Sequence, residues 1–469
     1  PPPGAAARAP AARRHHDGLL TRLWHSIGMA AASRGRASRD RRHAMSRTGR
    51  IAEAAEAAAA QGDDAGDAGA EARLRRLALA LSGFGLFILI LTLQPFSVPP
   101  ESTGPSAPNT GNLVNQIGYL VLGGLYLAAM LRLTPRPVLA RLGLGSWLAI
   151  FAVALLSTAQ APDPEASIRG LLLGAIALVV VAGVLVLPRD EADFAAGAVD
   201  ACLAVLVIVY GVLVFAHPLA VHGAEGAEGV HAGEWRGHLS HKNFAAPVFS
   251  MMAMIGIYGW RSGLRWRGGL IVALCLVFVV NSGSKTTLGF LPVAVAVVLL
   301  GRLAGRPGLA VALHLLLVAA LACLTLGTVL SQPLHGLAAA LLSDPSYTGR
   351  DEIWRFGLSH VAARPWTGYG YAGFWQTPVV TGLEENYEAS WDVRGIGSGH
   401  SSYLDALLMF GIPGGLVILW LLLVRPLRNY LAAARHPANR RLADLFAMIV
   451  IFMTYVGMLE SFLLNRSDP

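Results

Sequence analysis

Long apolar runs recur along most of this chain, and they constrain its fold more than any other feature. In a bilayer every backbone polar group must find its partner within the chain, so apolar runs near ~20 residues are expected to be membrane-spanning helices. Two of the runs, 269–281 and 287–300, are short and would also fit one merged or re-entrant segment. Eleven runs are recognised: 77–93, 113–131, 142–156, 171–187, 194–215, 244–260, 269–281, 287–300, 309–330, 404–424 and 442–460.

The composition agrees with this reading. Hydrophobic residues make up 54% of the 469 residues and charged residues only 14%, which is typical of polytopic membrane proteins and not of soluble enzymes. The three cysteines, Cys202, Cys275 and Cys323, lie inside apolar runs without paired spacing, so they are expected to be packing residues and not a disulfide or metal site. The sequence therefore predicts an all-α polytopic membrane protein of about 11–12 transmembrane helices.

Arginines are distributed unevenly between the connectors, and this predicts an orientation. Residues 1–76 are rich in arginine and alanine and lack the apolar core of a signal peptide, so we expect a basic, disordered cytoplasmic tail. Met29 and Met45 are alternative starting points, and no folded nucleic-acid reader accompanies the basic residues. Every second connector is then cation-rich, as the positive-inside rule requires. These connectors contain Arg132, Arg136, Arg141, Arg189, Arg261, Arg265, Arg267, Arg302, Arg306, Arg425, Arg428, Arg435, Arg440 and Arg441.

The polar interval 331–403 stands out because the other connectors are short. Disordered segments lack aromatic residues, whereas this one is rich in Trp and Tyr, so we expect it to fold as one large loop on the outer side of the membrane, which is the periplasmic side if the cell has two membranes. Trp354 and Trp366 are predicted to form the core of that loop, and Tyr371 and Trp375 are left unassigned. Glu384, Glu385 and Glu388 could hold a cation, although carboxylates in a solvated loop are more often simply hydrated.

Cations also occur on the predicted periplasmic side, where the insertion rule disfavours them. The chain has two lysines, Lys242 and Lys285, and both lie at predicted outer ends of spans, as do Arg236, Arg350 and His400. Each alone could extend to lipid headgroups or cap a helix. Together they suit an anionic ligand such as a pyrophosphate, since arginine offers a planar fork and lysine a point charge.

At these residues the sequence resembles the superfamily of O-antigen ligases and O-antigen polymerases. Four segments carry the resemblance: 235–243 (WRGHLSHKN), 281–287 (NSGSKTT), 349–375 with its GRDEIW and RPWTGYGYAGFW elements, and 399–414 with GHSSYL and GIPG. Lys285 stands where the family usually has arginine. The resemblance covers roughly residues 160 to 460 and is closest to the exopolysaccharide polymerase branch, in which a further helix after the last residue is expected.

The resemblance implies transfer of a glycan from an undecaprenyl-pyrophosphate carrier to a sugar hydroxyl, with inversion and without a cofactor, a metal or a nucleotide sugar. His400 would be the base, with His241 as the second choice, and Arg350, Arg236 and Lys285 would hold the pyrophosphate. Lys242 and Arg169 complete the predicted substrate-binding residues, although Arg169 also fits a headgroup contact.

The implied partners are the lipid-linked oligosaccharide, membrane lipid and a chain-length regulator, with no nucleic acid. Two other functions remain open: an O-antigen ligase that transfers the glycan to the lipid A core, and a transporter or flippase of glycolipids. The predicted organisation is a tail at 1–76, nine helices in 77–330, the periplasmic loop with the catalytic motif at 331–403, and C-terminal helices in 404–469.

Overall fold

A computed structural model describes residues 47–97, 113–142, 144–224, 229–384 and 392–463 of the chain. Within these ranges the structure is all-α, and the only β pairing is a single bridge between Val221 and Trp235. The protein is a polytopic membrane protein, as predicted. Seven of its described helical stretches are long and apolar enough to span a membrane.

Each of the eleven predicted runs coincides with a helix. The seven that satisfy length and hydropathy lie in α2 (Arg47–Leu91), α3 (Leu113–Leu133), α6 (Pro164–Val186), α7 (Glu191–Phe215), α10 (Lys285–Leu303), α11 (Pro307–Leu324), and α16 (Ser402–Leu419) continued by α17 (Arg425–Ala433). The other four form α5 (Leu144–Ser157), α8 (Lys242–Arg261), α9 (Arg265–Asn281) and α18 (Arg440–Val456). Short helices fill the connectors: α4 (Arg136–Leu139), α12 (Leu326–Leu330), α13 (Gln332–Leu341), α14 (Arg350–Ala363) and α15 (Pro378–Thr381).

Local sequence explains where several helices begin and end. Asp163 accepts a hydrogen bond from the backbone N–H of Ala166 at 2.9 Å and is followed by Pro164, a pairing that favours a helix start. Between α9 and α10 the chain turns at Gly283, whose φ of +63° suits glycine. The two short runs are therefore separate helices joined by a tight turn.

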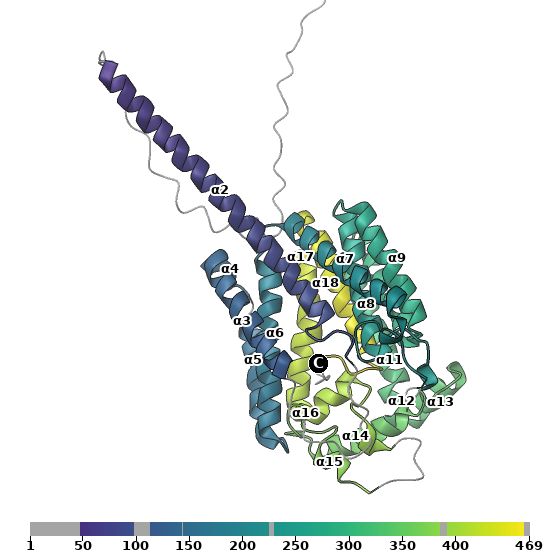
Figure 1. Cartoon of the computed structure of the whole chain (residues 1–469). Coiled ribbons are helices and arrows are strands. Elements are labelled where there is room, and N and C mark those ends of the chain that lie inside the picture. The colour runs from purple at the N-terminus through teal and green to yellow at the C-terminus, as the bar shows by residue number, and fades with distance from the viewer. Residues whose placement is uncertain (1–46, 98–112, 143, 225–228, 385–391, 464–469) are drawn as a thin grey trace, which may run out of the picture.

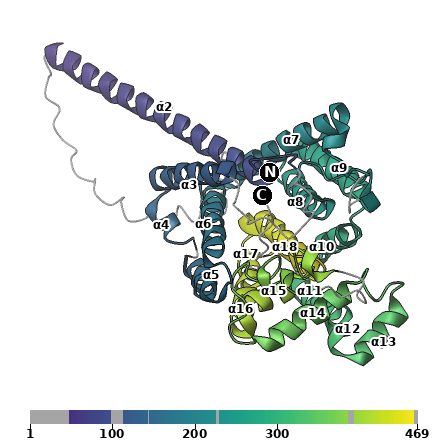
Figure 2. The ribbon, with the colours of Figure 1, turned by 60° about the horizontal axis from the view of Figure 1, so that its bottom comes forward.

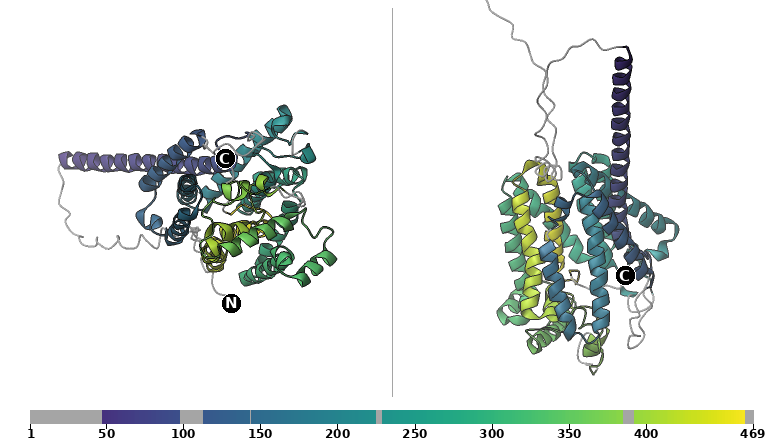
Figure 3. Two further views of the ribbon diagram at one scale, coloured as in Figure 1. Left: turned by 90° about the horizontal axis from the view of Figure 1, so that it is seen from below. Right: turned by 90° about the vertical axis from the view of Figure 1, so that its left-hand side faces the viewer.

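The N-terminal boundary differs from the prediction. Helix α2 begins at Arg47, so it includes residues 47–76 of the predicted tail, and residues 1–46 lie outside the described residues. The physical reason is the alanine content of this segment, because alanine has the highest intrinsic helix propensity. Figure 1 shows α2 extending well beyond the rest of the helices, and the right-hand view in Figure 3 shows the same projection from the side.

The two ends of the helix bundle differ in chemistry. At one end, which we call the arginine end, ion pairs join neighbouring helices: Arg261 and Arg302 with Asp444, Arg441 with Glu191, and Arg75 with Asp193. The opposite end, which we call the loop end, contains the connector after α7 and the segments with α12 to α15 (Figure 1). The arginines of the predicted cytoplasmic connectors thus meet acidic partners at one end of the molecule.

The loop end has a hydrophobic core of its own. Trp354 of α14 is fully buried and packs in a cluster with Tyr369, Phe374 and Leu404, so it is a core residue of the loop, as expected. Trp366 is not, because 77% of its surface is exposed. Its backbone, not its ring, packs against Gly411 of α16, and the side chain is left outside. Figure 2, which tips this end forward, shows α14 and α15 beside α16.

Candidate functional site

Two of the predicted site residues, Arg350 and His400, meet at Glu460, which follows α18. Its Oε1 lies 2.9 Å from Nη2 of Arg350 and 3.2 Å from Nδ2 of Asn243. Its Oε2 lies 3.4 Å from Nδ1 of His400. One carboxylate therefore connects the start of α14, the start of α8 and the residue that precedes α16. We call Glu460, Arg350, His400 and Asn243 the Glu460 cluster.

Arg350 is the first residue of α14. The helix starts there because Gly349 has a φ of 80°, a conformation that ends the preceding turn and is open to glycine. The guanidinium also donates to the carbonyl of Leu459, so it is held by both the backbone and the side chain of the segment after α18. Its side chain is 17% exposed.

The segment that carries Glu460 is attached to the beginning of α16. The backbone N–H of Ser402 donates to the carbonyl of Gly457 at 2.8 Å, and the Ser402 hydroxyl donates to the carbonyl of Glu460 at 2.9 Å. In return, the backbone N–H of Phe462 donates to the Ser402 hydroxyl at 2.9 Å. These bonds fix the position of the Glu460 carboxylate relative to His400, two residues before Ser402.

His400 has an unusual backbone conformation that its neighbours maintain. Its φ is 46°, in the left-handed region that few residues other than glycine adopt. The preceding residue, Gly399, is held on both sides: its N–H donates to Oδ1 of Asp405 at 3.0 Å, and its carbonyl accepts from Nε1 of Trp354 at 3.1 Å. Trp375 donates to the same Oδ1 at 2.7 Å. Buried groups of the loop and of α16 thus set the direction of the imidazole.

The charges of the cluster define its protonation pattern. Burial alone would raise the pKa of Glu460, but the hydrogen bond with His400 and the charge of Arg350 outweigh it, so that pKa lies below its usual value. An ionised carboxylate only accepts hydrogen bonds, so Nδ1 of His400 is the donor in this contact. A neutral imidazole with this tautomer can accept a proton at Nε2.

His241 caps the N-terminus of α8 beside this cluster. Its Nδ1 accepts the backbone N–H of Asn243 at 3.0 Å, and its ring centroid lies 5.0 Å from that of His222 and 5.5 Å from that of His231. Burial, together with the nearby His222 and His231, lowers the pKa of His241 to about 3. His241 is therefore neutral near pH 7, and its observed contact is that of a helix cap.

The remaining predicted residues have other contacts. Arg236 is buried and donates to the carbonyls of Leu219 and Leu239 at 2.9 Å and of Val221 at 3.1 Å, so its guanidinium braces the connector between α7 and α8. Lys242 is also buried, with Nζ 2.5 Å from Oε2 of Glu234. Both cations belong to the same connector that delivers Asn243 to Glu460.

Lys285 and Arg169 lie on helices at the loop end. Lys285 is exposed at the first position of α10, directly after the turn at Gly283 that packs against Glu234. Arg169 lies near Glu165 on the same helix face, with Nη1 3.9 Å from Oε1. The structure thus joins Arg350 and His400 through a shared partner, whereas Lys285 lies on α10 and Arg169 on α6.

Sequence reasoning missed Glu460 and Asp405 as site residues. Both are acids within or beside apolar runs, and ionisable residues in such positions are costly unless they have a partner or a function. The position of a single acid within or beside an apolar run could therefore have identified both residues from the sequence. Asn243 was part of the quoted His-Lys-Asn segment but had received no role.

The acidic residues of the loop do not form a metal site among the described residues. Glu384 is exposed, and Glu385, Glu388 and Trp391 lie outside the described residues. Across the part of the chain that the structure describes, no group of three or more His, Cys, Asp or Glu side chains has a geometry that could hold a metal ion.

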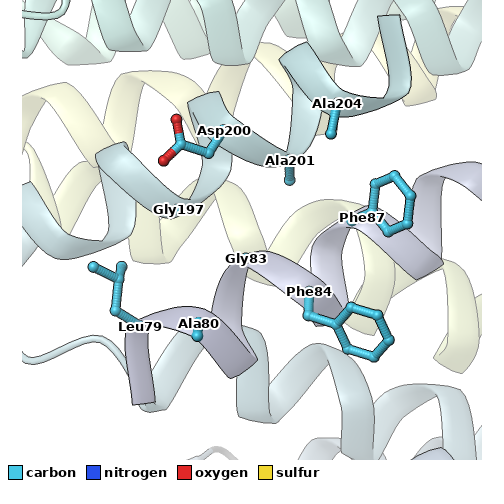
Figure 4. A pocket seen from close by; sticks show the side chains of 9 residues that line it. All are labelled: Leu79, Ala80, Gly83, Phe84, Phe87, Gly197, Asp200, Ala201 and Ala204. Atoms are coloured by element: carbon cyan, nitrogen blue, oxygen red, sulfur yellow. The ribbon is translucent and has the colours of Figure 1, made fainter. Parts of the chain in front are cut away.

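The best-defined hollows of the described surface are elsewhere. Figure 4 shows one between α2 and α7, where Gly83 and Gly197 let the two helices approach closely and Phe84 and Phe87 flank the gap. A second lies between α8 and α9. Neither is lined by a residue of the Glu460 cluster.

Comparison with known proteins agrees with the geometry at the loop end. The family model described as O-Antigen ligase (Wzy_C) matches residues 270–419, a stretch that runs from α9 through most of α16. It contains Lys285, Arg350 and His400, and it ends before Glu460. The resemblance read from the motifs is thereby supported for this stretch. No curated protein matches the chain.

Proposed function

We propose that this chain is a membrane glycosyltransferase that polymerises undecaprenyl-pyrophosphate-linked repeat units into an exopolysaccharide or O-antigen. The observation that carries the proposal is the Glu460 cluster, in which a fixed arginine and a histidine share one carboxylate. An inverting transfer from a lipid pyrophosphate needs these two groups: a base for the acceptor and a positive charge for the leaving group. The match of residues 270–419 to the O-antigen ligase family supports the same chemistry.

The reaction proceeds in one displacement. The acceptor hydroxyl oxygen attacks the anomeric carbon of the donor sugar while its proton passes to Nε2 of His400. The bond between the anomeric carbon and the pyrophosphate oxygen breaks, and its electron pair leaves with undecaprenyl pyrophosphate. Arg350 stabilises the negative charge that develops there. Attack from the face opposite the leaving group inverts the anomeric configuration.

The other cations would extend the binding surface for the donor. Lys285, exposed at the start of α10, is placed to meet a phosphate near the membrane surface. Arg236, Lys242 and His241 support the site through the connector that carries Asn243, and Arg169 is a headgroup contact at the edge. None of these roles requires a cofactor.

The arginine end supports the proposed orientation. Cation-rich connectors face the cytoplasm in bacterial inner-membrane proteins, so the N-terminus and the arginine end would be cytoplasmic and the loop end periplasmic. Lipid-linked repeat units are then met by Arg350 and His400 on the periplasmic side. The chain-length regulator implied by the resemblance would act on that side as well.

A second candidate function is ligation of the finished glycan to the lipid A core, because the matched family is described by that activity. The two reactions share donor and leaving group and differ in the acceptor. A deletion strain that accumulates single lipid-linked repeat units supports the polymerase. Polymer of normal length stranded on undecaprenyl pyrophosphate supports the ligase.

The proposed roles are tested by His400→Ala and Arg350→Ala in the purified full-length chain with a lipid-linked repeat unit as substrate. Each change removes a group that acts on the reacting atoms, so we expect product formation to fall at least ~100-fold, as for loss of a general base or a charge-stabilising donor. The measurement is the length of the glycan by gel electrophoresis. His217→Ala, an exposed histidine at the loop end, and Arg355→Ala, on the same helix as Arg350, serve as controls and should retain activity. Wild-type polymer from either site variant would refute its assigned role.

A further inference from the structure

Glu460 serves two groups with different tasks in the proposed reaction. Its Oε1 pairs with Arg350 at 2.9 Å, and its Oε2 faces Nδ1 of His400 at the longer distance of 3.4 Å. Its side chain is 9% exposed, so water screens these interactions weakly. One oxygen of the carboxylate therefore contacts the cation that would hold the leaving group, and the other contacts the base that would accept the proton.

A bound anion would change how strongly Glu460 interacts with Arg350 and with His400. Phosphate oxygens compete with a carboxylate for an arginine because both fit the same planar fork of N–H donors. An anion that takes the guanidinium of Arg350 draws positive charge away from Glu460. The carboxylate then interacts with His400 more strongly, since the closest positive charge no longer compensates it.

We propose that Glu460 is a positioning residue that couples the two halves of the site, so that occupancy of Arg350 by a pyrophosphate assigns the carboxylate to His400. The inference rests on the proposed function of Arg350 and His400. With the pyrophosphate in place, Glu460 holds the Nδ1–H of His400, directs Nε2 toward the acceptor and increases its affinity for a proton. The base is thus strongest when the leaving group is held.

Other charged and titratable groups lie around the pair. Asp405 of α16 lies on the side of His400, His241 lies near Glu460 at the start of α8, and the neighbouring Lys242 is paired with Glu234. Asn243 keeps a neutral hydrogen bond to Oε1 at 3.2 Å and can hold that oxygen when Arg350 turns to the anion. The coupling therefore needs movement of one arginine side chain only.

The test follows chemical modification of His400 with inorganic pyrophosphate as the probe. Diethyl pyrocarbonate reacts with neutral imidazole, and peptide mass spectrometry gives the rate at His400 in the purified chain between about pH 5 and 8, where histidine titrates. In the wild type we expect saturating pyrophosphate to slow the reaction about 3- to 10-fold near pH 7, since a one-unit change in proton affinity is tenfold. In Glu460→Gln pyrophosphate should still bind, but the rate should change less than about twofold.

Controls separate coupling from simple shielding and from misfolding. An ion that merely covers the ring would slow modification equally in the wild type and in Glu460→Gln, and that result would overturn the inference. Glu460→Asp keeps the charge and should retain slowing by pyrophosphate, so it serves if the glutamine variant unfolds; loss of slowing in a folded Glu460→Asp also counts against the coupling. Glu384→Gln removes an exposed acid and should behave as the wild type.

The same experiment distinguishes the inference from the proposed function. Binding of pyrophosphate, measured by calorimetry, should be lost in Arg350→Ala. Failure of the wild type to bind pyrophosphate would overturn both the clamp and the coupling. Binding that depends on Arg350 without any effect on His400 would overturn the coupling alone. The proposal also predicts an effect on catalytic activity. In Glu460→Gln the acid limb of the pH–activity profile should shift to lower pH, because His400 loses the nearby negative charge that increases its affinity for a proton.

Discussion

His400 shows at the scale of single residues how the site is organised. Its backbone has a left-handed φ of 46°, and its ring lies against Glu460. The hydrogen bonds that maintain this strained conformation are made to Gly399, the preceding residue, and not to His400. The neighbouring residues therefore determine the conformation of His400. The motif read from the sequence identified the histidine, but the groups that aim it come from α14, α16 and the segment after α18.

Two buried histidines at the loop end should make stability depend on pH. Burial lowers the pKa of His238 to about 4, against a partial opposing effect of the Ile90 carbonyl, and that of His241 to about 3. In the unfolded chain both regain a pKa near 6.5. As pH falls below 6.5 the unfolded state binds protons first, so stability is present above that pH and is lost progressively toward pH 4.

We therefore expect the thermal unfolding midpoint in detergent to fall between pH 7 and pH 5. His238→Gln, which cannot take up the proton, should flatten this dependence, and His217→Gln at an exposed position should leave it unchanged. A midpoint that does not vary over this range would contradict the assignment of His238 and His241 as neutral buried groups.

At the scale of elements, the break in α16 determines how the loop lies on the bundle. Gly411 has φ 67° and ψ 179° inside the helix, which frees backbone groups there. The loop supplies partners: the N–H of Tyr369 donates to the carbonyl of Leu408 at 2.7 Å, and the N–H of Ile412 donates to the carbonyl of Pro365 at 2.7 Å. The loop is thus attached to α16 by backbone hydrogen bonds on both sides of Gly411.

This attachment requires glycine at position 368. Its φ is +63°, and a Cβ there would come within 2.6 Å of the backbone nitrogen of Gly411. We expect Gly368→Ala to destabilise the protein by about 1–3 kcal/mol, the usual range for a strained backbone, and to lower activity by displacing the loop. Gly395→Ala, where a Cβ meets nothing within 4 Å, is the matched control. Equal unfolding midpoints for the two variants would contradict the close approach.

At the scale of the whole molecule, opposite ends of the same helices have different tasks. Each of the helices α8, α10 and α18 has one terminus at the loop end and the other at the arginine end. At the arginine end Asp444 is 1% exposed and lies 2.7 Å from Arg261 of α8 and 3.4 Å from Arg302 of α10. This one acid joins three helices far from the Glu460 cluster.

Replacement of Asp444 by Asn should therefore leave two cations without their shared counter-ion. Loss of one partner of a buried ion pair typically costs about 3–5 kcal/mol, so the unfolding midpoint should drop by several degrees. The protein that remains folded should keep its rate of glycan transfer, because no group at the Glu460 cluster changes. Asp392→Asn, in a local and more exposed pair with Arg394, is the control and should have a small effect. An unaltered midpoint in Asp444→Asn would argue against its structural role.

Much of the architecture could be predicted because apolar length and charge placement are local properties. Every predicted run became a helix, since a span of this kind satisfies its own backbone hydrogen bonds without help from the rest of the chain. Trp366 was misassigned because its neighbours in the sequence resemble those of a core residue. Only the fold shows that the Pro365–Trp366 backbone occupies the contact with Gly411.

The sequence by itself determined the class of protein, the positions of its membrane helices and the identity of Arg350 and His400 as candidate site residues. Only the tertiary structure decided that these two share Glu460, that Arg236 is held by backbone carbonyls and that His400 is held in a left-handed conformation. The physical reason is distance along the chain. Glu460 meets Arg350 and His400 across separations of 110 and 60 residues, and such contacts depend on how helices pack and not on local pattern.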